Sequence, residues 1–146
     1  MARVDYVAIK KKVYDTLLAA SAFGGALDGV KVLYGKADVL ADKCPLVAVW
    51  SGESQQQQVT MGGAKPRRAI YTVHVDCVDV SLKGMQDADD KLASLLSRVE
   101  EVLQQDPTLG GLAEDAEVTG SKFDEGDDGS YQLAGATITF RVEVRT

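Results

Sequence analysis

Two segments of the chain place hydrophobic residues at helical spacing. The clearer one covers residues 85–105, where apolar positions recur every three or four residues: Leu92, Leu95, Leu96, Val99, Val102 and Leu103. Residues 5–22 follow the same rule less regularly, at Val4, Val7, Ala8, Val13, Leu17 and Leu18. Asp5 is the expected N-cap of this first helix, and Gly24-Gly25 ends it. The pattern predicts two helices, each with one apolar face.

Other segments alternate with a period of two, which is typical of strands buried on one face. Residues 69–80 place Tyr71, Val73, Val75 and Cys77 on one side, and residues 131–144 alternate in the same way. Residues 29–35 and 117–123 are shorter predicted strands, and the acidic run 124–129 reads as a hairpin turn. Residues 46–50, LVAVW, are apolar throughout, which favours a central strand covered on both faces.

Residues 51–68, SGESQQQQVTMGGAKPRR, interrupt this pattern. The segment is polar and glycine-bearing, so we predict a projecting loop or the tip of a long hairpin. The element order is then α-β-β-loop-β-α-β-β. It indicates an α+β fold, with a mostly antiparallel sheet and two helices packed on one face.

Composition supports one globular domain spanning residues 1–146. The chain is 45% hydrophobic and 26% charged, and no apolar run is long enough to span a membrane. The start lacks the apolar core of a signal peptide, so we expect a protein made in a cytoplasm. The net charge of −6 is uneven. Residues 1–73 hold ten Lys/Arg against six Asp/Glu, and residues 74–146 hold six against sixteen. Such asymmetry suits stacking on copies or partners, although simple drift of surface charge explains it equally well.

Candidate chemistry is sparse. His74, the single histidine, falls on the polar phase of a strand, where we expect an exposed or edge position. The cysteines Cys44 and Cys77 lie in no CxxC motif and are expected to be free structural thiols. Residues 124–128 fail the spacing of a calcium loop, and Gly62-Gly63-Ala64-Lys65 is not a phosphate loop. We predict no enzyme, no catalytic residue, no cofactor and no metal site.

The remaining candidates lie in the predicted loop. Three positive charges fall within four residues, beside four glutamines. They form either a solvated hairpin tip or a contact arm toward an acidic partner or a nucleic-acid backbone. The candidate contact residues are Gln55, Gln56, Gln57, Gln58, Lys65, Arg67 and Arg68.

The layout resembles the tail terminator (tail completion, minor tail protein U-like) family of long-tailed bacteriophages and prophages. The resemblance covers nearly the whole chain and rests on pattern-level matches rather than on a chemical fingerprint. These are DYVAI at 5–9, CPLVAVW at 44–50, LQQDPTLGGL at 103–112 and ATITFRVEVRT at 136–146.

The resemblance implies a non-enzymatic α+β subunit that forms a homo-hexameric ring on the head-proximal end of the tail tube. Its partners are then the tail tube protein and the head–tail connector or stopper protein. DNA passes through the lumen without sequence-specific binding, and the membrane plays no part. The implied location is the neck region of the virion tail, reached from the host cytoplasm during assembly.

Three other interpretations remain open at this point. One is another head–tail neck or tube ring protein, such as a stopper or connector subunit. A second is a non-viral binding module that grips a peptide. The third is a small enzyme built on His74, Asp76 or the acidic turn, for which no convergent set of groups can be assembled from the sequence.

Overall fold

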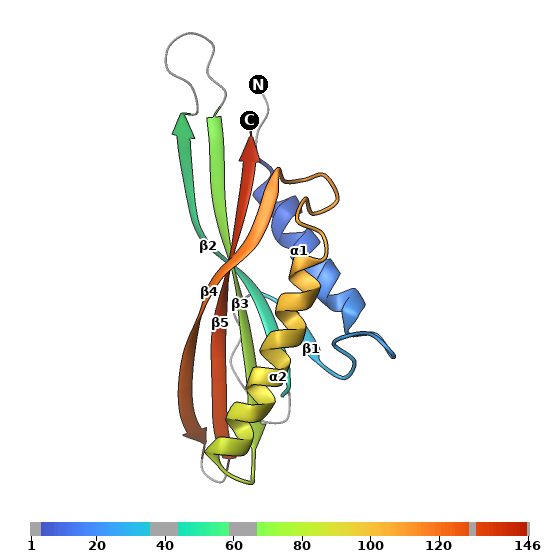
Figure 1. Ribbon diagram of the computed structural model, residues 1–146, viewed down its shortest axis with the longest axis vertical. Coiled ribbons are helices and arrows are strands. Elements are labelled where there is room, and N and C mark those ends of the chain that lie inside the picture. The colour runs from blue at the N-terminus through green and yellow to red at the C-terminus, as the bar shows by residue number, and fades with distance from the viewer. Residues whose placement is uncertain (1–3, 36–43, 59–66, 129–130, 146) are drawn as a thin grey trace.

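The alternating segments build one five-stranded sheet (Figure 1). The computed structural model describes residues 4–35, 44–58, 67–128 and 131–145. The strands are β1 (Lys31–Tyr34), β2 (Leu46–Gln58), β3 (Arg67–Ser81), β4 (Asp115–Asp128) and β5 (Tyr131–Arg145). Their spatial order is β1-β2-β3-β5-β4. β1 runs parallel to β2, and every other neighbouring pair is antiparallel. The expected α+β fold with a mostly antiparallel sheet is therefore confirmed.

Two helices, α1 (Tyr6–Ala20) and α2 (Met85–Gln104), cover the same face of this sheet (Figure 1). The Asp5 carboxylate caps α1 as predicted, accepting a hydrogen bond of 2.9 Å from the Ala8 N–H. The predicted apolar stripe of α1 is partly wrong, because Val7 is 69% exposed and Leu18 is 42% exposed. The buried stripe is Ile9, Val13 and Leu17, which recur every four residues and so stay on one side of the helix.

The core lies between the helices and the facing side of the sheet. α2 buries all six of its predicted apolar positions, together with Ala88. β5 contributes Ile138, Phe140 and Val142, each with no more than trace exposure. Full burial of a side chain of this size stabilises a fold by about 1.5–3 kcal/mol before entropy is counted. Cys77 lies inside the same core and is a free thiol, as expected.

The segment predicted as a projecting loop or the tip of a long hairpin, residues 51–68, is in large part strand. Residues 51–58 continue β2, and residues 67 and 68 begin β3, so of the two alternatives the structure has the long hairpin. Residues 59–66 lie outside the described part of the chain. β2 extends because its residues 54–58 pair with residues 67–71 of β3. This pairing satisfies backbone N–H and C=O groups of β2 whatever the side chains are.

The acidic run also differs from expectation. Residues 124–128 belong to β4, and Asp128 is still in register with Tyr131 of β5. The predicted pairing of the two strands is present, but residues 124–128, which were predicted to form the turn, are part of the paired strand β4. Within the described residues, no helix is long and apolar enough to cross a membrane.

Candidate functional site

The candidate contact residues lie on a two-stranded extension of the sheet. We call this extension the arm: residues 51–58 of β2 paired with residues 67–73 of β3 (Figure 1). Gln55 and Gln56 are exposed and pair with Ile70 and Ala69. The backbones of Gln57 and Gln58 pair with Arg68 and Arg67. The arm therefore brings six of the seven predicted residues together, and Lys65 lies outside the described residues.

Arg68 is not the free contact cation that its sequence context suggested. Its guanidinium is 3.6 Å from the Glu143 carboxylate, and the two side chains are 33% and 18% exposed. Glu143 also accepts a shorter ion pair of 2.6 Å from Arg141, which in turn lies 3.6 Å from Glu117. These side chains form a row of alternating charge across β3, β5 and β4. Part of the local positive charge is thus already neutralised within the chain, which leaves less for a partner.

A β-bulge sets the base of the arm. The register between β2 and β3 shifts between Ser51 and Ser54, which adds one residue to β2 and increases the local twist. Tyr6 at the start of α1 bonds the Ser54 hydroxyl at 2.6 Å. The Tyr6 ring also packs edge-on against the Tyr71 ring at 4.8 Å. The Tyr71 hydroxyl bonds Ser51 at 2.6 Å, on the other side of the bulge. These contacts hold the arm in a defined direction relative to α1.

On the face opposite the helices, two rings lie in contact beside the bulge, tilted by 36° to each other. The His74 imidazole lies 4.4 Å from the Trp50 indole, centroid to centroid. Gly52 leaves room for this ring, because a Cβ at residue 52 would lie 2.6 Å from His74 Nε2. The expectation of an exposed or edge histidine is therefore wrong: His74 is half-buried on the central strand β3. Its Nδ1 is buried without a hydrogen-bond partner among the described residues.

Sequence reasoning missed the two sheet edges. β1 covers β2 only from Leu46 to Val49, so within the described chain the arm portion of β2 is paired on one side only. β4 is the opposite edge and is paired only with β5 along its described length. Edge strands carry unpaired backbone N–H and C=O groups, which can extend a sheet into a neighbouring molecule. The only sequence signal for these edges was the polar, acidic composition of β4.

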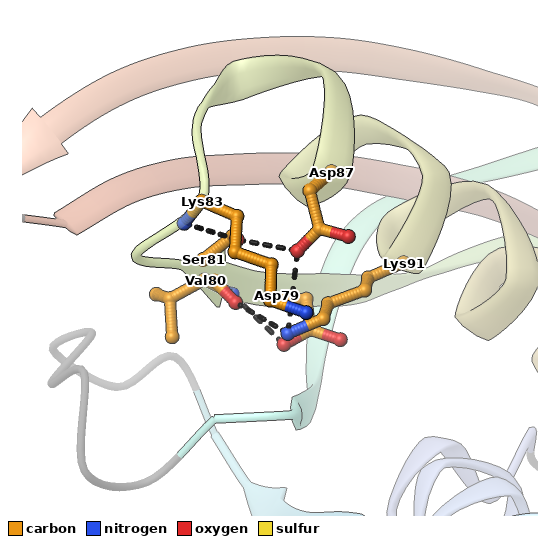
Figure 2. A network of polar contacts seen from close by, with 6 residues as sticks. All are labelled: Asp79, Val80, Ser81, Lys83, Asp87 and Lys91. Carbon is orange, nitrogen blue, oxygen red and sulfur yellow. Dashed lines mark hydrogen bonds and ion pairs between the residues drawn. The ribbon is translucent and has the colours of Figure 1, made fainter.

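A polar network at the far end of the sheet serves the fold (Figure 2). The Ser81 hydroxyl donates to the Asp87 carboxylate and accepts the Lys83 N–H at 2.9 Å. Lys91 lies 3.6 Å from Asp87, one helical turn away. The hydrogen bond from Ser81, helped by the charge of Lys91, lowers the pKa of Asp87. The network ties the end of β3 to the first turn of α2. Ser81, Lys83 and Lys91 also line an open hollow of about 310 Å³ beside Val80 and Leu82.

Shallow grooves lie between α1 and the end of α2. One, of about 470 Å³, is lined by Lys12, Asp15, Thr16, Ala19, Ala20, Val102 and Gln105. The Thr16 hydroxyl in this groove donates to the Lys12 carbonyl oxygen at 2.7 Å. Burial raises the pKa of the Cys77 thiol, which disfavours the reactive thiolate. Among the described residues, no three His, Cys, Asp or Glu side chains cluster as metal ligands would.

Comparison with solved structures identifies a chain of the same fold. It comes from a structure titled "Virion of native gene transfer agent (GTA) particle", with a TM-score of 0.61 and 11% identity. The match covers 99% of this chain and 100% of the other. At this identity the likeness shows the fold. No family model matches the sequence, and no curated protein matches it.

Proposed function

We propose that this chain is a structural virion protein of a phage-like particle, and that it acts as a tail terminator. In this role, copies form a ring that caps the head-proximal end of the tail tube, stops its polymerisation and joins it to the head connector. The observation that carries the proposal is the fold match to a chain of a gene transfer agent virion, because the match covers 99% of this chain and 100% of the other. The pattern-level resemblance of the sequence to tail terminators supports the narrower role.

The surface of the molecule agrees with an assembly role. An arm tied to α1 by Tyr6 can present Gln55 and Gln56 to a neighbour without unfolding the core. The proposed contact residues are the exposed glutamines Gln55 and Gln56, together with Gln57, Gln58, Lys65, Arg67 and Arg68. Because Arg68 already pairs with Glu143, we expect it to contribute less to partner binding, and the charge-reversal test uses Lys65 and Arg67.

The first test is assembly. Purified protein is examined by light scattering and negative-stain microscopy over a range of concentrations, alone and with tail tubes. A ring of about six subunits, or a capped tube end, is the expected result. Stable compact dimers at every concentration would refute the proposal.

Loss of the gene separates a terminator from other neck proteins. A missing terminator leaves overlong tails, whereas a missing stopper leaves finished tails and detached heads. Overlong tails are expected here. Finished tails of normal length would transfer the proposal to the stopper role.

The contact arm is tested by reversing charge. Lys65→Glu with Arg67→Glu should abolish ring formation or tube capping, and the melting temperature of the variant is measured to separate this effect from loss of the fold. Lys11→Glu with Lys31→Glu is the matched control, because both lysines are exposed, lie outside the arm and give the same change in net charge. Normal assembly of the arm variant would remove the arm from the mechanism.

A further inference from the structure

The two edges of the sheet that have no partner strand among the described residues run in opposite directions. β2 pairs antiparallel with β3, β3 with β5, and β5 with β4. Three reversals make β2 and β4 antiparallel to each other. If a second copy is placed beside the first in the same orientation, its β4 meets the free part of β2 with the polarity of an ordinary antiparallel pair. Rotation about an axis parallel to the strands produces this arrangement for every copy of a ring.

We infer that the free edge of β2, residues 51–58, pairs with β4 of the adjacent copy, so that the sheet continues from subunit to subunit. The inference deepens the proposed function, since it assumes a ring. It names the partner of each edge as a second copy of this chain. It also assigns an interface role to β4, a strand that contains none of the predicted contact residues.

Charge disfavours the pairing of two β4 edges. β4 carries six carboxylates and one lysine, Lys122, a net charge of −5. Two β4 strands laid edge to edge would place like charges opposite each other, which is destabilising. The free edge of β2, residues 51–58, carries a single charged residue, Glu53. The strongest repulsion therefore falls on the pairing of two β4 edges, and pairing of unlike edges gives a head-to-tail ring rather than a two-fold dimer.

The register of the sheet specifies where the edges meet. Gln55 pairs with Ile70, Ile70 with Glu143, and Glu143 with Asp115, which defines one row across β2, β3, β5 and β4. With strands parallel to the ring axis, Gln55 of one copy faces Asp115 of the next. If the strands are tilted to the ring axis, the contact moves along β4 by two residues at a time, because only every second residue points to the same face of the sheet. The first such position after Asp115 is Glu117. Gln55, Asp115 and Glu117 are all exposed in the single chain.

Cysteine cross-linking tests the pairing. Gln55→Cys is combined in one chain with Asp115→Cys or with Glu117→Cys, in a Cys44→Ser background, and the assembled ring or capped tube is oxidised. Within one chain these positions are separated by three strand spacings, about 14 Å. A disulfide needs Cα atoms within about 7 Å, so it can form only between copies. The expected result is a ladder of covalent multimers in at least one of the two pairs.

Two variants serve as controls. Gln55→Cys with Phe123→Cys should give no ladder, because Phe123 is exposed on the helix side of β4 and lies eight residues beyond Asp115. Gln55→Cys alone should remain monomeric after oxidation. A covalent dimer from that single variant would show two β2 edges paired with each other, and would overturn the inference.

The inference and the proposed function can fail separately. Capped tubes without a ladder from either cysteine pair would overturn the edge pairing and leave the terminator proposal standing. A ladder in concentrated protein that never caps a tube would confirm the pairing and count against the terminator role. Absence of a ladder in concentrated protein and in tube mixtures alike would overturn the pairing.

Discussion

Gly52 is the position where a single methyl group should disturb the arm. An added Cβ would lie 2.6 Å from His74 Nε2, 2.7 Å from His74 Cδ2 and 3.0 Å from the Thr72 carbonyl oxygen. Contacts this short require movement. The histidine ring must leave its place against Trp50, or the bulged strand must shift away from β3. Gly52→Ala should therefore destabilise the fold and change the direction of the arm.

The cost of Gly52→Ala follows from these contacts. Overpacking a filled site typically costs about 1–3 kcal/mol, and loss of a ring–ring contact accounts for about 0.5–1.5 kcal/mol of that range. For a chain of this length, about 2 kcal/mol lowers the melting temperature by roughly 4–8 °C. The two single variants and the double variant with His74→Ala form a cycle. With the imidazole removed, only the contact to the Thr72 carbonyl remains, so Gly52→Ala should cost less than half as much in the His74→Ala background.

The chain supplies its own spectroscopic probes. Trp50 is the only tryptophan and His74 the only histidine, so indole fluorescence and the imidazole NMR signals each come from one member of this contact. Urea unfolding followed by Trp50 fluorescence gives the four free energies of the cycle. Gly120→Ala is the matched control, since Gly120 also lies at a register shift but has open space where its Cβ would be. Equal costs of Gly52→Ala in both backgrounds, within about 0.3 kcal/mol, would refute the proposed clash.

Two further predictions concern the core and the network at the far end of the sheet. Phe140 is fully buried, so Phe140→Ala should lower the free energy of unfolding by about 3–5 kcal/mol in a urea titration; a loss below 1 kcal/mol would contradict its placement in the core. Asp87 has its pKa lowered below the ordinary 3.8 by the Ser81 hydrogen bond and Lys91, so its ionised form stabilises the fold above that pH and the benefit disappears on further acidification. The stability difference between wild type and Asp87→Asn, measured by urea unfolding from pH 6 to pH 2.5, should shrink as the pH falls; a constant difference would refute it.

The elements that sequence patterns located well are those with one buried face. β3 and β5 alternate because the helices cover one side of the sheet, so the positions of Val75 and Ile138 could be read from periodicity. The stripe of α2 was equally readable. In α1, several apolar residues lie outside the buried stripe, and Val7 is mostly exposed, so the period alone did not identify the buried face.

The arm and the histidine could not be located in this way. Residues 51–56 are exposed, so no apolar alternation marks them as strand; their pairing depends on β3, a partner distant in sequence. His74 does occupy a polar phase, as its neighbours indicated. What buries its ring is Trp50 and the bulge at Gly52, and that register shift is set by tertiary pairing. The edge role of β4 likewise follows from strand order, which no local pattern encodes.

Both ends of the described chain lie beside the arm. Tyr6 touches Ser54, and Arg145 is in register with Arg68, so the N- and C-terminal residues share one end of the sheet (Figure 1). An affinity tag fused to either terminus would therefore sit next to the residues proposed for assembly and could block it by bulk alone. Tags at both termini should be removed before assembly is scored. A fluorescent label belongs instead at Lys83, which is exposed in the connection from β3 to α2 at the opposite end of the molecule.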